Sequence, residues 1–247
     1  MTKILAHRGA NKHAPQNTLP AFLKAIELGA DGVENDVHLT RDGELVICHN
    51  YTIDETSDGT GSISDYTLAE LKQFDFGSYF SPAFAGTRIP TLHEFLEIAA
   101  PFSVINVEIK SPESGEKEIV RKTIDCVKEH KLFDRLIISS FDPRLLVEAK
   151  EIDPATRTGF LYSPDSPVIE QVYDDPIAYA KSIKADALHP LIAYVDEEYL
   201  EDAHKAGLIV NPWTVNLEEA MRLCGAWGSD GIITDVPDVA VNVLRGK

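Results

Sequence analysis

Short apolar runs alternate with amphipathic segments along almost the whole chain. The first apolar run covers residues 3–8, and Leu19, Phe22 and Ile26 then recur at helical spacing in a segment that Gly29 closes. Apolar residues three to four positions apart predict one buried face of a helix, and a glycine directly after the last of them is typical of a helix end. The chain therefore begins as a strand followed by a helix.

The same alternation continues to the C-terminus and predicts eight strand–helix units. The units are 3–8 with Thr18–Leu28, Gly32–Leu39 with Thr91–Ala99, Ser103–Lys110 with Glu116–Lys131, Leu136–Phe141 with Pro143–Ile152, Thr158–Tyr162 with Pro176–Lys184, Ala187–Pro190 with Glu197–Ala206, Leu208–Val215 with Leu217–Trp227, and Gly231–Thr234 with Val236–Leu244. Strict alternation implies a parallel sheet, and eight units that close on themselves give an α/β fold, the (β/α)₈ TIM barrel. A doubly wound open sheet is the alternative.

The second unit contains a small insertion. Asp42-Gly43 is a turn dipeptide, so we expect Glu44–His49 to pair as a hairpin with the strand before it. Residues 51–90 show no clean period and are rich in glycine and proline, which we interpret as an insertion after strand 2 at the mouth of the barrel. No break in composition marks a linker, so residues 1–247 are expected to form a single domain.

Composition places the chain among ordinary globular proteins. Hydrophobic residues make up 44% of the 247 residues and charged residues 26%, and no run approaches the roughly 18 apolar residues of a membrane span. The N-terminus lacks the apolar stretch of a secretion signal, and Cys48, Cys126 and Cys224 are widely spaced, as expected for buried, reduced thiols. These features favour a cytoplasmic protein.

The formal net charge is −17, and no cluster of lysine or arginine is present. Nucleic acids and anionic membranes require basic surfaces, so we expect neither a nucleic-acid partner nor stable membrane association. If the substrate is a small anion, the site must supply local positive charge from a metal ion or from individual cationic side chains.

Polar side chains gather where the first three strands end. They are His7, Arg8, Glu34, Asp36, His49, Glu108 and Lys110. Active sites of these barrels lie at the C-terminal ends of the strands. Side chains alternate along a strand, so Glu34 and Asp36 share one face, and the neighbouring Val33 and Val37 must take the opposite face toward the helices. The carboxylates are therefore expected to point into the barrel.

Three carboxylates in one small volume repel each other unless they are protonated or bridged by a cation. Glu34, Asp36 and Glu108 offer oxygen ligands, which hard cations such as Mg²⁺ or Ca²⁺ select. Zinc is the alternative, but His7 and His49 lack a short ligand spacing and suit proton transfer better. Taken alone, each of these signals is more often structural. We interpret the remaining histidines, His13, His38, His93, His130, His189 and His204, as structural.

The order of these residues resembles the glycerophosphodiester phosphodiesterase family. The matching elements are His7-Arg8-Gly9, Pro15-Gln16-Asn17-Thr18, Gly29-Ala30-Asp31, Glu34-x-Asp36, Thr40-x-Asp42-Gly43, His49, Glu108-x-Lys110 and Thr234-Asp235-x-Pro237. They extend over essentially the whole chain, and so many separated elements make the resemblance highly specific.

The resemblance implies a role for each matching residue. His7 and His49 correspond to the catalytic acid–base pair, and Glu34, Asp36 and Glu108 to the ligands of a divalent metal, Mg²⁺ or Ca²⁺. Arg8 and Lys110 correspond to groups that bind the substrate phosphate. Trp213 resembles an aromatic residue of the seventh strand that lines the substrate pocket, although a barrel-core role is equally consistent with its position.

The chain departs from the family pattern at two positions. Gln16 stands where the family usually has glutamate, and Asn50 stands where it usually has aspartate after the histidine. Both changes remove a carboxylate but keep a hydrogen-bonding side chain. We expect them to affect substrate preference and the tuning of His49 more than the reaction itself.

The implied activity is metal-dependent hydrolysis of small-molecule glycerophosphodiesters, such as glycerophosphocholine or glycerophosphoethanolamine, to glycerol 3-phosphate and an alcohol. Attack by water and attack by the glycerol 2-hydroxyl both remain open. A lysophospholipase D-type phosphodiesterase is an alternative within the family, for which Tyr79, Phe80 and Phe84 of the insertion give only a slight indication. A barrel that binds phosphate or metal without turnover is the alternative from another class, and two histidines beside the ligand argue against it.

Overall fold

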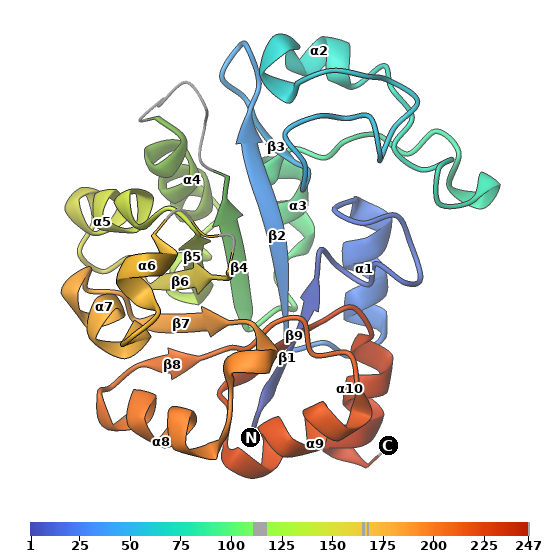
Figure 1. The fold of residues 1–247 in the computed structure, drawn as a ribbon. Coiled ribbons are helices and arrows are strands. Elements are labelled where there is room, and N and C mark those ends of the chain that lie inside the picture. The colour runs from blue at the N-terminus through green and yellow to red at the C-terminus, as the bar shows by residue number, and fades with distance from the viewer. Residues whose placement is uncertain (111–117, 165, 167, 247) are drawn as a thin grey trace.

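The computed structural model describes residues 1–110, 118–164, 166 and 168–246, and at its centre a ring of strands is surrounded by helices (Figure 1). The strands are β1 (Lys3–His7), β2 (Gly32–Leu39), β3 (Leu45–Ile47), β4 (Val104–Ile109), β5 (Leu136–Ser140), β6 (Thr158–Tyr162), β7 (Ala187–Pro190), β8 (Ile209–Val210) and β9 (Gly231–Thr234). The α-helices are α1 (Leu19–Glu27), α2 (Leu68–Leu71), α3 (Leu92–Ile98), α4 (Glu118–Glu129), α5 (Pro143–Ile152), α6 (Ile169–Val172), α7 (Pro176–Ser182), α8 (Glu197–Lys205), α9 (Glu218–Trp227) and α10 (Pro237–Arg245).

Eight of the strands form a nearly closed parallel barrel. They pair in the order β8-β7-β6-β5-β4-β2-β1-β9, and each of these pairs is parallel. Single hydrogen bonds join the two ends of this order: the N–H of Ile233 donates to the carbonyl of Pro212, and the N–H of Val215 donates to the carbonyl of Ile233, both at 2.9 Å. The predicted (β/α)₈ barrel is confirmed, and the alternative of a doubly wound open sheet is excluded.

The interior and exterior of the barrel wall are packed separately. Inward-facing Leu5, Val104, Ile137 and Ile233 form a small apolar cluster at the centre, while the outward-facing residues pack against the helices. Gly159 also faces inward, and a Cβ atom at this position would lie 2.7 Å from the imidazole of His189. The small residue on β6 thus makes room for a large one on the neighbouring strand β7.

The hairpin and the insertion follow the expected pattern. β3 pairs antiparallel with β2, and Gly43 in the turn has a φ of 78°, which glycine adopts readily. The insertion, residues 51–90, follows β3 in the sequence and lies beside the hairpin, at the C-terminal end of β2 (Figure 1). It shares with the hairpin its own apolar cluster, named the insertion cluster below: Val46, Cys48, Ile53, Ile63, Leu71, Phe76 and Ile89.

The structure differs from the predicted elements at two places, and a third prediction is not tested. The strand expected over Leu208–Val215 is regular only in β8, because Pro212 has no N–H to donate to a strand ladder. The four-residue helix α6 was not predicted, since it is too short to show a helical period. The expected start of the fourth helix at Glu116 lies outside the described residues.

Cys48, Cys126 and Cys224 are free and buried, as expected. None of the helices in the described part of the chain has both the length and the apolar character needed to cross a bilayer.

Candidate active site

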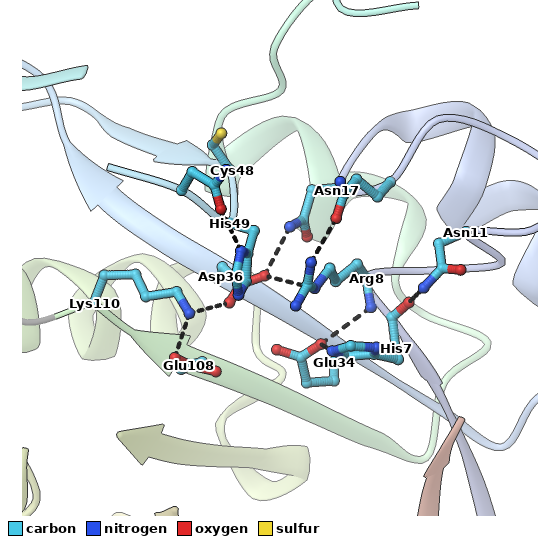
Figure 2. Close-up of polar contacts among 12 residues, drawn as sticks. His7, Arg8, Asn11, Asn17, Glu34, Asp36, Cys48, His49, Glu108 and Lys110 are labelled. Carbon is cyan, nitrogen blue, oxygen red and sulfur yellow. Dashed lines mark hydrogen bonds and ion pairs between the residues drawn. The ribbon is translucent and has the colours of Figure 1, made fainter. Parts of the chain in front are cut away.

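All eight predicted site residues meet at the C-terminal end of the barrel, and Figure 2 shows those other than Trp213. One cavity is lined by His7, Arg8, Glu34, His49, Asn106, Glu108, Phe141, Leu161, Trp213 and Ile233. Asp36 and Lys110 adjoin it, with the Lys110 Nζ 2.7 Å from Asp36 Oδ1. β1, β2 and β4 are neighbours in the barrel, so their ends deliver these groups to one place although they are far apart in sequence.

The turn after β1 aims Arg8 into this cavity. Arg8 has a φ of 56° and Gly9 a φ of 77°, so two consecutive residues are left-handed, a conformation that is uncommon for residues other than glycine. A Cβ at Gly9 would lie 2.8 Å from the backbone of Ala21 in α1. The close approach of α1 therefore requires glycine here, and the turn directs the Arg8 N–H to Glu34 Oε2 at 3.0 Å.

The three carboxylates form a compact buried cluster. One oxygen each of Glu34, Asp36 and Glu108 lies within 4.8 Å of the others, and all three residues are buried. Burial, together with the charges of Asp36 and Glu108, raises the pKa of Glu34 well above its usual value. Within the described part of the chain, Glu34 Oε1 is buried without a hydrogen-bond partner. The cluster thus has an oxygen to spare and an excess of negative charge, which a divalent cation would satisfy.

Two cationic side chains compensate part of this charge. The Lys110 ammonium contacts both Asp36 and Glu108, while the Arg8 Nε lies 3.8 Å from Asp36 Oδ2 on the other side (Figure 2). Burial alone would raise the pKa of Asp36, but the charges of Lys110, His49 and Arg8 hold it well below its usual range. Burial also opposes the charged form of Lys110, yet the two carboxylates raise its pKa above the usual value. Both groups are therefore ionised.

His7 is held from behind by an acidic residue at the far end of the sequence. Its Nδ1 lies 2.6 Å from Asp235 Oδ1, and Asn11 donates to the same carboxylate oxygen at 2.6 Å. The His7 Nε2 is 3.9 Å from Glu34 Oε2. Burial lowers the pKa of His7 below its usual value, although the hydrogen bond with Asp235 opposes this shift. The carboxylate of Asp235 would stabilise His7 if it took up a proton.

His49 has an amide as its partner. Its Nδ1 lies 2.6 Å from Asn50 Oδ1, and the Asn50 Nδ2 donates to Glu55 Oε2 at 2.8 Å. Burial lowers the pKa of His49 to about 4; Asp36 opposes the shift and Lys110 adds to it. With Nδ1 occupied, Nε2 is the nitrogen that remains for proton exchange, and the ring is neutral at neutral pH.

Gln16, the other departure from the family pattern, contacts Arg8. The Gln16 Oε1 accepts a hydrogen bond from Arg8 Nη1 at 2.7 Å, so the amide orients the guanidinium without adding a charge.

Trp213 lies against Phe141 with ring centroids 5.6 Å apart, and its Nε1 donates to the carbonyl of His189.

Several residues that complete the site had no predicted role. They are Asn11, Asn17, Glu55, Asn106, Phe141 and Asp235. Asp235 belongs to a motif that matched the family, and this was the one signal that pointed to it. Asn17, whose Nδ2 donates to Asp36 Oδ2 at 2.7 Å, also lay in a matched motif. No motif pointed to the others: Asn11 and Phe141 contact residues that are distant in sequence, Glu55 contacts Asn50 five residues away, and Asn106 lines the cavity from β4.

The chain was compared with known proteins. A model of the "Glycerophosphoryl diester phosphodiesterase family" matches residues 7–239. A glycerophosphodiester phosphodiesterase of Caldanaerobacter subterraneus is 41% identical over 245 residues, covering 99% of this chain and 98% of the relative. Another, from Bacillus altitudinis, is 36% identical and covers 98% of both chains.

Among solved structures, an Oleispira antarctica phosphodiesterase in complex with the product sn-glycerol-3-phosphate is 31% identical and superimposes with a TM-score of 0.87, covering 99% of this chain and 97% of that one. The family model matches nearly the whole chain, and the 41% identical relative is covered almost completely. The chain therefore belongs to the glycerophosphoryl diester phosphodiesterase family, and it is a phosphodiesterase.

Proposed function

We propose that this phosphodiesterase hydrolyses glycerophosphodiesters, such as glycerophosphocholine or glycerophosphoethanolamine, to glycerol 3-phosphate and the free alcohol, using a divalent cation and two histidines. The observation that carries the proposal is the single cavity in which His7 and His49 flank a buried carboxylate cluster beside Arg8. The product bound to the similar Oleispira phosphodiesterase supports glycerol 3-phosphate as the common product.

Glu34, Asp36 and Glu108 are the residues that would hold the cation. Their oxygen-only donor set suits Mg²⁺ or Ca²⁺, and the buried, unpartnered Oε1 of Glu34 is a free ligand atom in the part of the chain described. When bound, such an ion supplies charge stabilisation to the phosphoryl oxygens. It would also relieve the repulsion that raises the pKa of Glu34.

Arg8 and Lys110 would bind the phosphodiester. Both already lie beside Asp36, so they bring two positive charges into a protein whose formal charge is −17. The same charges favour the negative charge that develops on the phosphoryl oxygens during the reaction. These two charges offset part of the negative charge of the carboxylate cluster, and a bound cation would offset more of it.

His7 and His49 would transfer the protons. One imidazole takes a proton from the attacking hydroxyl, and the other gives a proton to the oxygen of the departing alcohol as its bond to phosphorus breaks. In each ring, Nδ1 is engaged from behind, by Asp235 for His7 and by Asn50 for His49, which fixes the ring and leaves Nε2 for the exchange.

The deciding experiment is hydrolysis of glycerophosphocholine and glycerophosphoethanolamine by the purified protein, before and after chelation. We expect activity that chelator removes and that Mg²⁺ or Ca²⁺ restores. His7→Ala and His49→Ala should each lower turnover by a factor on the order of 10²–10⁴. In calorimetric titrations both variants should still bind the cation, whereas Glu34→Ala should not.

A substrate with an activated leaving group, such as a p-nitrophenyl phosphodiester, separates the two histidines. A good leaving group needs little protonation, so the variant that is partly rescued on this substrate identifies the general acid. If both histidine variants lost cation binding in proportion to their activity, the histidines would be ligands and the assigned roles would be wrong. Activity that persisted after complete chelation would remove the cation from the proposal.

A further inference from the structure

A second group of metal-ligating side chains lies outside the barrel, between α3 and α4. His93 belongs to the first turn of α3, Cys126 lies on α4, and His130 directly follows α4. One nitrogen of each histidine and the Cys126 Sγ all lie within 4.8 Å of one another. The proposed hydrolysis does not use these residues, and the sequence suggested only structural roles for them.

Helix geometry explains why these groups converge. Cys126 and His130 are four residues apart, and the N–H of His130 donates to the carbonyl of Cys126 at 3.4 Å, so the helical turn continues beyond the end of α4. Residues at this spacing share a helix face, as do ligand pairs in helical metal sites. Packing of α3 against α4 then brings His93 Nδ1 to 2.9 Å from His130 Nε2.

We propose that His93, Cys126 and His130 bind a transition-metal ion such as Zn²⁺, at a site independent of the carboxylate cluster. Imidazole and thiolate ligands select zinc and related ions, and Mg²⁺ and Ca²⁺ prefer oxygen. With Zn–N and Zn–S bonds of usual length, the ligand atoms of a tetrahedral site lie roughly 3.3–3.8 Å apart. The three atoms therefore need only small side-chain rotations to take up ligand positions.

The surroundings support three protein ligands and one open position. Glu129 Oε2 lies 3.8 Å from His93 Nε2, the nitrogen of that ring that points away from His130. A carboxylate beside the second nitrogen of a ligating histidine fixes its tautomer and orientation. The His93 side chain is 56% exposed, so an ion reaches the group from solvent and a water molecule can complete its coordination.

Binding would link two neighbouring helices of the barrel. Cys126 is almost fully buried, whereas His93 is exposed, so an ion between them would connect the buried face of α4 to the rim of α3. A ligand that binds only the folded state stabilises it. Zn²⁺ is therefore expected to raise the unfolding temperature of the wild type.

Titration with Co²⁺ in the presence of excess Mg²⁺, which keeps the carboxylate cluster occupied, tests the proposal. We expect about one equivalent of Co²⁺ to give the visible absorption of a tetrahedral ion and a thiolate-to-cobalt charge-transfer band, and Zn²⁺ to displace it. Cys126→Ser should abolish the charge-transfer band. Cys224→Ser, which removes another buried free thiol, should leave it unchanged.

Histidine variants keep the test independent of the folding of Cys126→Ser. His93→Gln changes an exposed side chain, and we expect it to weaken Co²⁺ and Zn²⁺ binding by more than the roughly 10–100-fold that loss of an outer partner causes. His204→Gln on α8, which removes a surface histidine paired with Asp230, is the matched control and should bind as the wild type does. Absence of the charge-transfer band in the wild type, its survival in Cys126→Ser, or unchanged affinity in His93→Gln would each overturn the site.

Discussion

Asn50 can orient His49 by a hydrogen bond although its side chain carries no charge. An amide has a donor end and an acceptor end, and only the acceptor end can receive a hydrogen bond from His49 Nδ1. The carboxylate of Glu55 accepts from Asn50 Nδ2, which turns the oxygen of the amide toward His49. We infer that Glu55 is a positioning residue: it would fix the amide, and the amide would fix the tautomer of His49 that leaves Nε2 free.

At this scale we predict that Glu55→Ala lowers turnover and that Glu55→Gln does not. Glu55 is exposed and contributes one hydrogen bond, so losing it should cost about 1 kcal/mol, or roughly fivefold in rate. Glutamine keeps an acceptor oxygen for Asn50 and should retain most of the activity. Steady-state kinetics on glycerophosphocholine, with unfolding temperatures as the control for stability, measures both effects.

Asn50→Asp provides the complementary measurement. A carboxylate beside His49 favours the protonated ring, so it should raise the pKa of His49 and move to higher pH the limb of the pH–rate profile that His49 controls. In the same variant the new carboxylate faces Glu55, so adding Glu55→Gln should improve activity by removing the repulsion. Superimposable profiles for the wild type and Asn50→Asp, and equal activity of Glu55→Ala and Glu55→Gln, would contradict the positioning role.

Among the elements, the insertion has a distinct role because its apolar cluster supports the hairpin that carries His49. Val46 and Cys48 belong to both the hairpin and the insertion cluster, and Leu71 of α2 is fully buried in it. α2 itself is only four residues long and begins with a capping box between Thr67 and Glu70. Side-chain burial therefore holds this part of the chain, because so short a helix has little stability of its own.

We predict that Leu71→Ala impairs catalysis more than it destabilises the whole fold. Leu146→Ala in α5 is the matched control, since Leu146 is also fully buried but packs in the large cluster between the barrel and its helices. Each change removes about 2–5 kcal/mol of packing. Leu71→Ala should lower turnover at 25 °C with local loss of hydrogen-exchange protection in residues 51–90, and Leu146→Ala should lower the unfolding temperature while keeping its activity. Equal effects of the two variants on both measurements would show that the insertion does not support the site separately.

Elements were predictable from sequence where the hydrophobic period was long and well punctuated. Thr91 and Glu94 form a capping box at the start of α3, and the helix begins at the expected place. β8 was overestimated because apolar residues continue past Pro212 although regular pairing does not. Apolar character predicts burial, but a strand also requires backbone N–H donors to pair with its neighbours. The hydrophobic pattern indicates only the burial.

For the molecule as a whole, the barrel was predictable because eight units in strict alternation leave few other topologies. The grouping of the polar side chains was predictable because strand ends meet at one rim. The pairing of His7 with Asp235 was not predictable from local pattern. It depends on β1 lying beside β9, and only closure of the barrel brings these two strands together. The group of His93, Cys126 and His130 was not predicted for a similar reason. The contact between α3 and α4 sets its geometry, and His93 is far from the other two residues in sequence.

The interior of the barrel also determines how the molecule responds to acid. His189 is completely buried, its Nε2 accepts from Asn211 Nδ2 at 3.1 Å, and its Nδ1 has no partner among the described residues. Burial lowers the pKa of His189 to about 3. In the unfolded chain a histidine titrates near its usual pKa of about 6.5, so between these values the unfolded state binds more protons than the folded state.

The contribution of His189 to stability is therefore fully present above about pH 6.5 and is lost as the pH falls toward the folded pKa of about 3. We predict that His189→Gln, whose side-chain oxygen can still accept from Asn211, reduces the slope of unfolding free energy against pH in this window by up to about 1.4 kcal/mol per pH unit. Urea unfolding of both proteins between pH 4 and pH 7, monitored by circular dichroism, measures the difference. Other acidic groups titrate in the same range, but they are common to both proteins and cancel in the comparison. Parallel curves would mean that His189 is protonated as easily inside the barrel as in the unfolded chain, and that the barrel interior admits the charge.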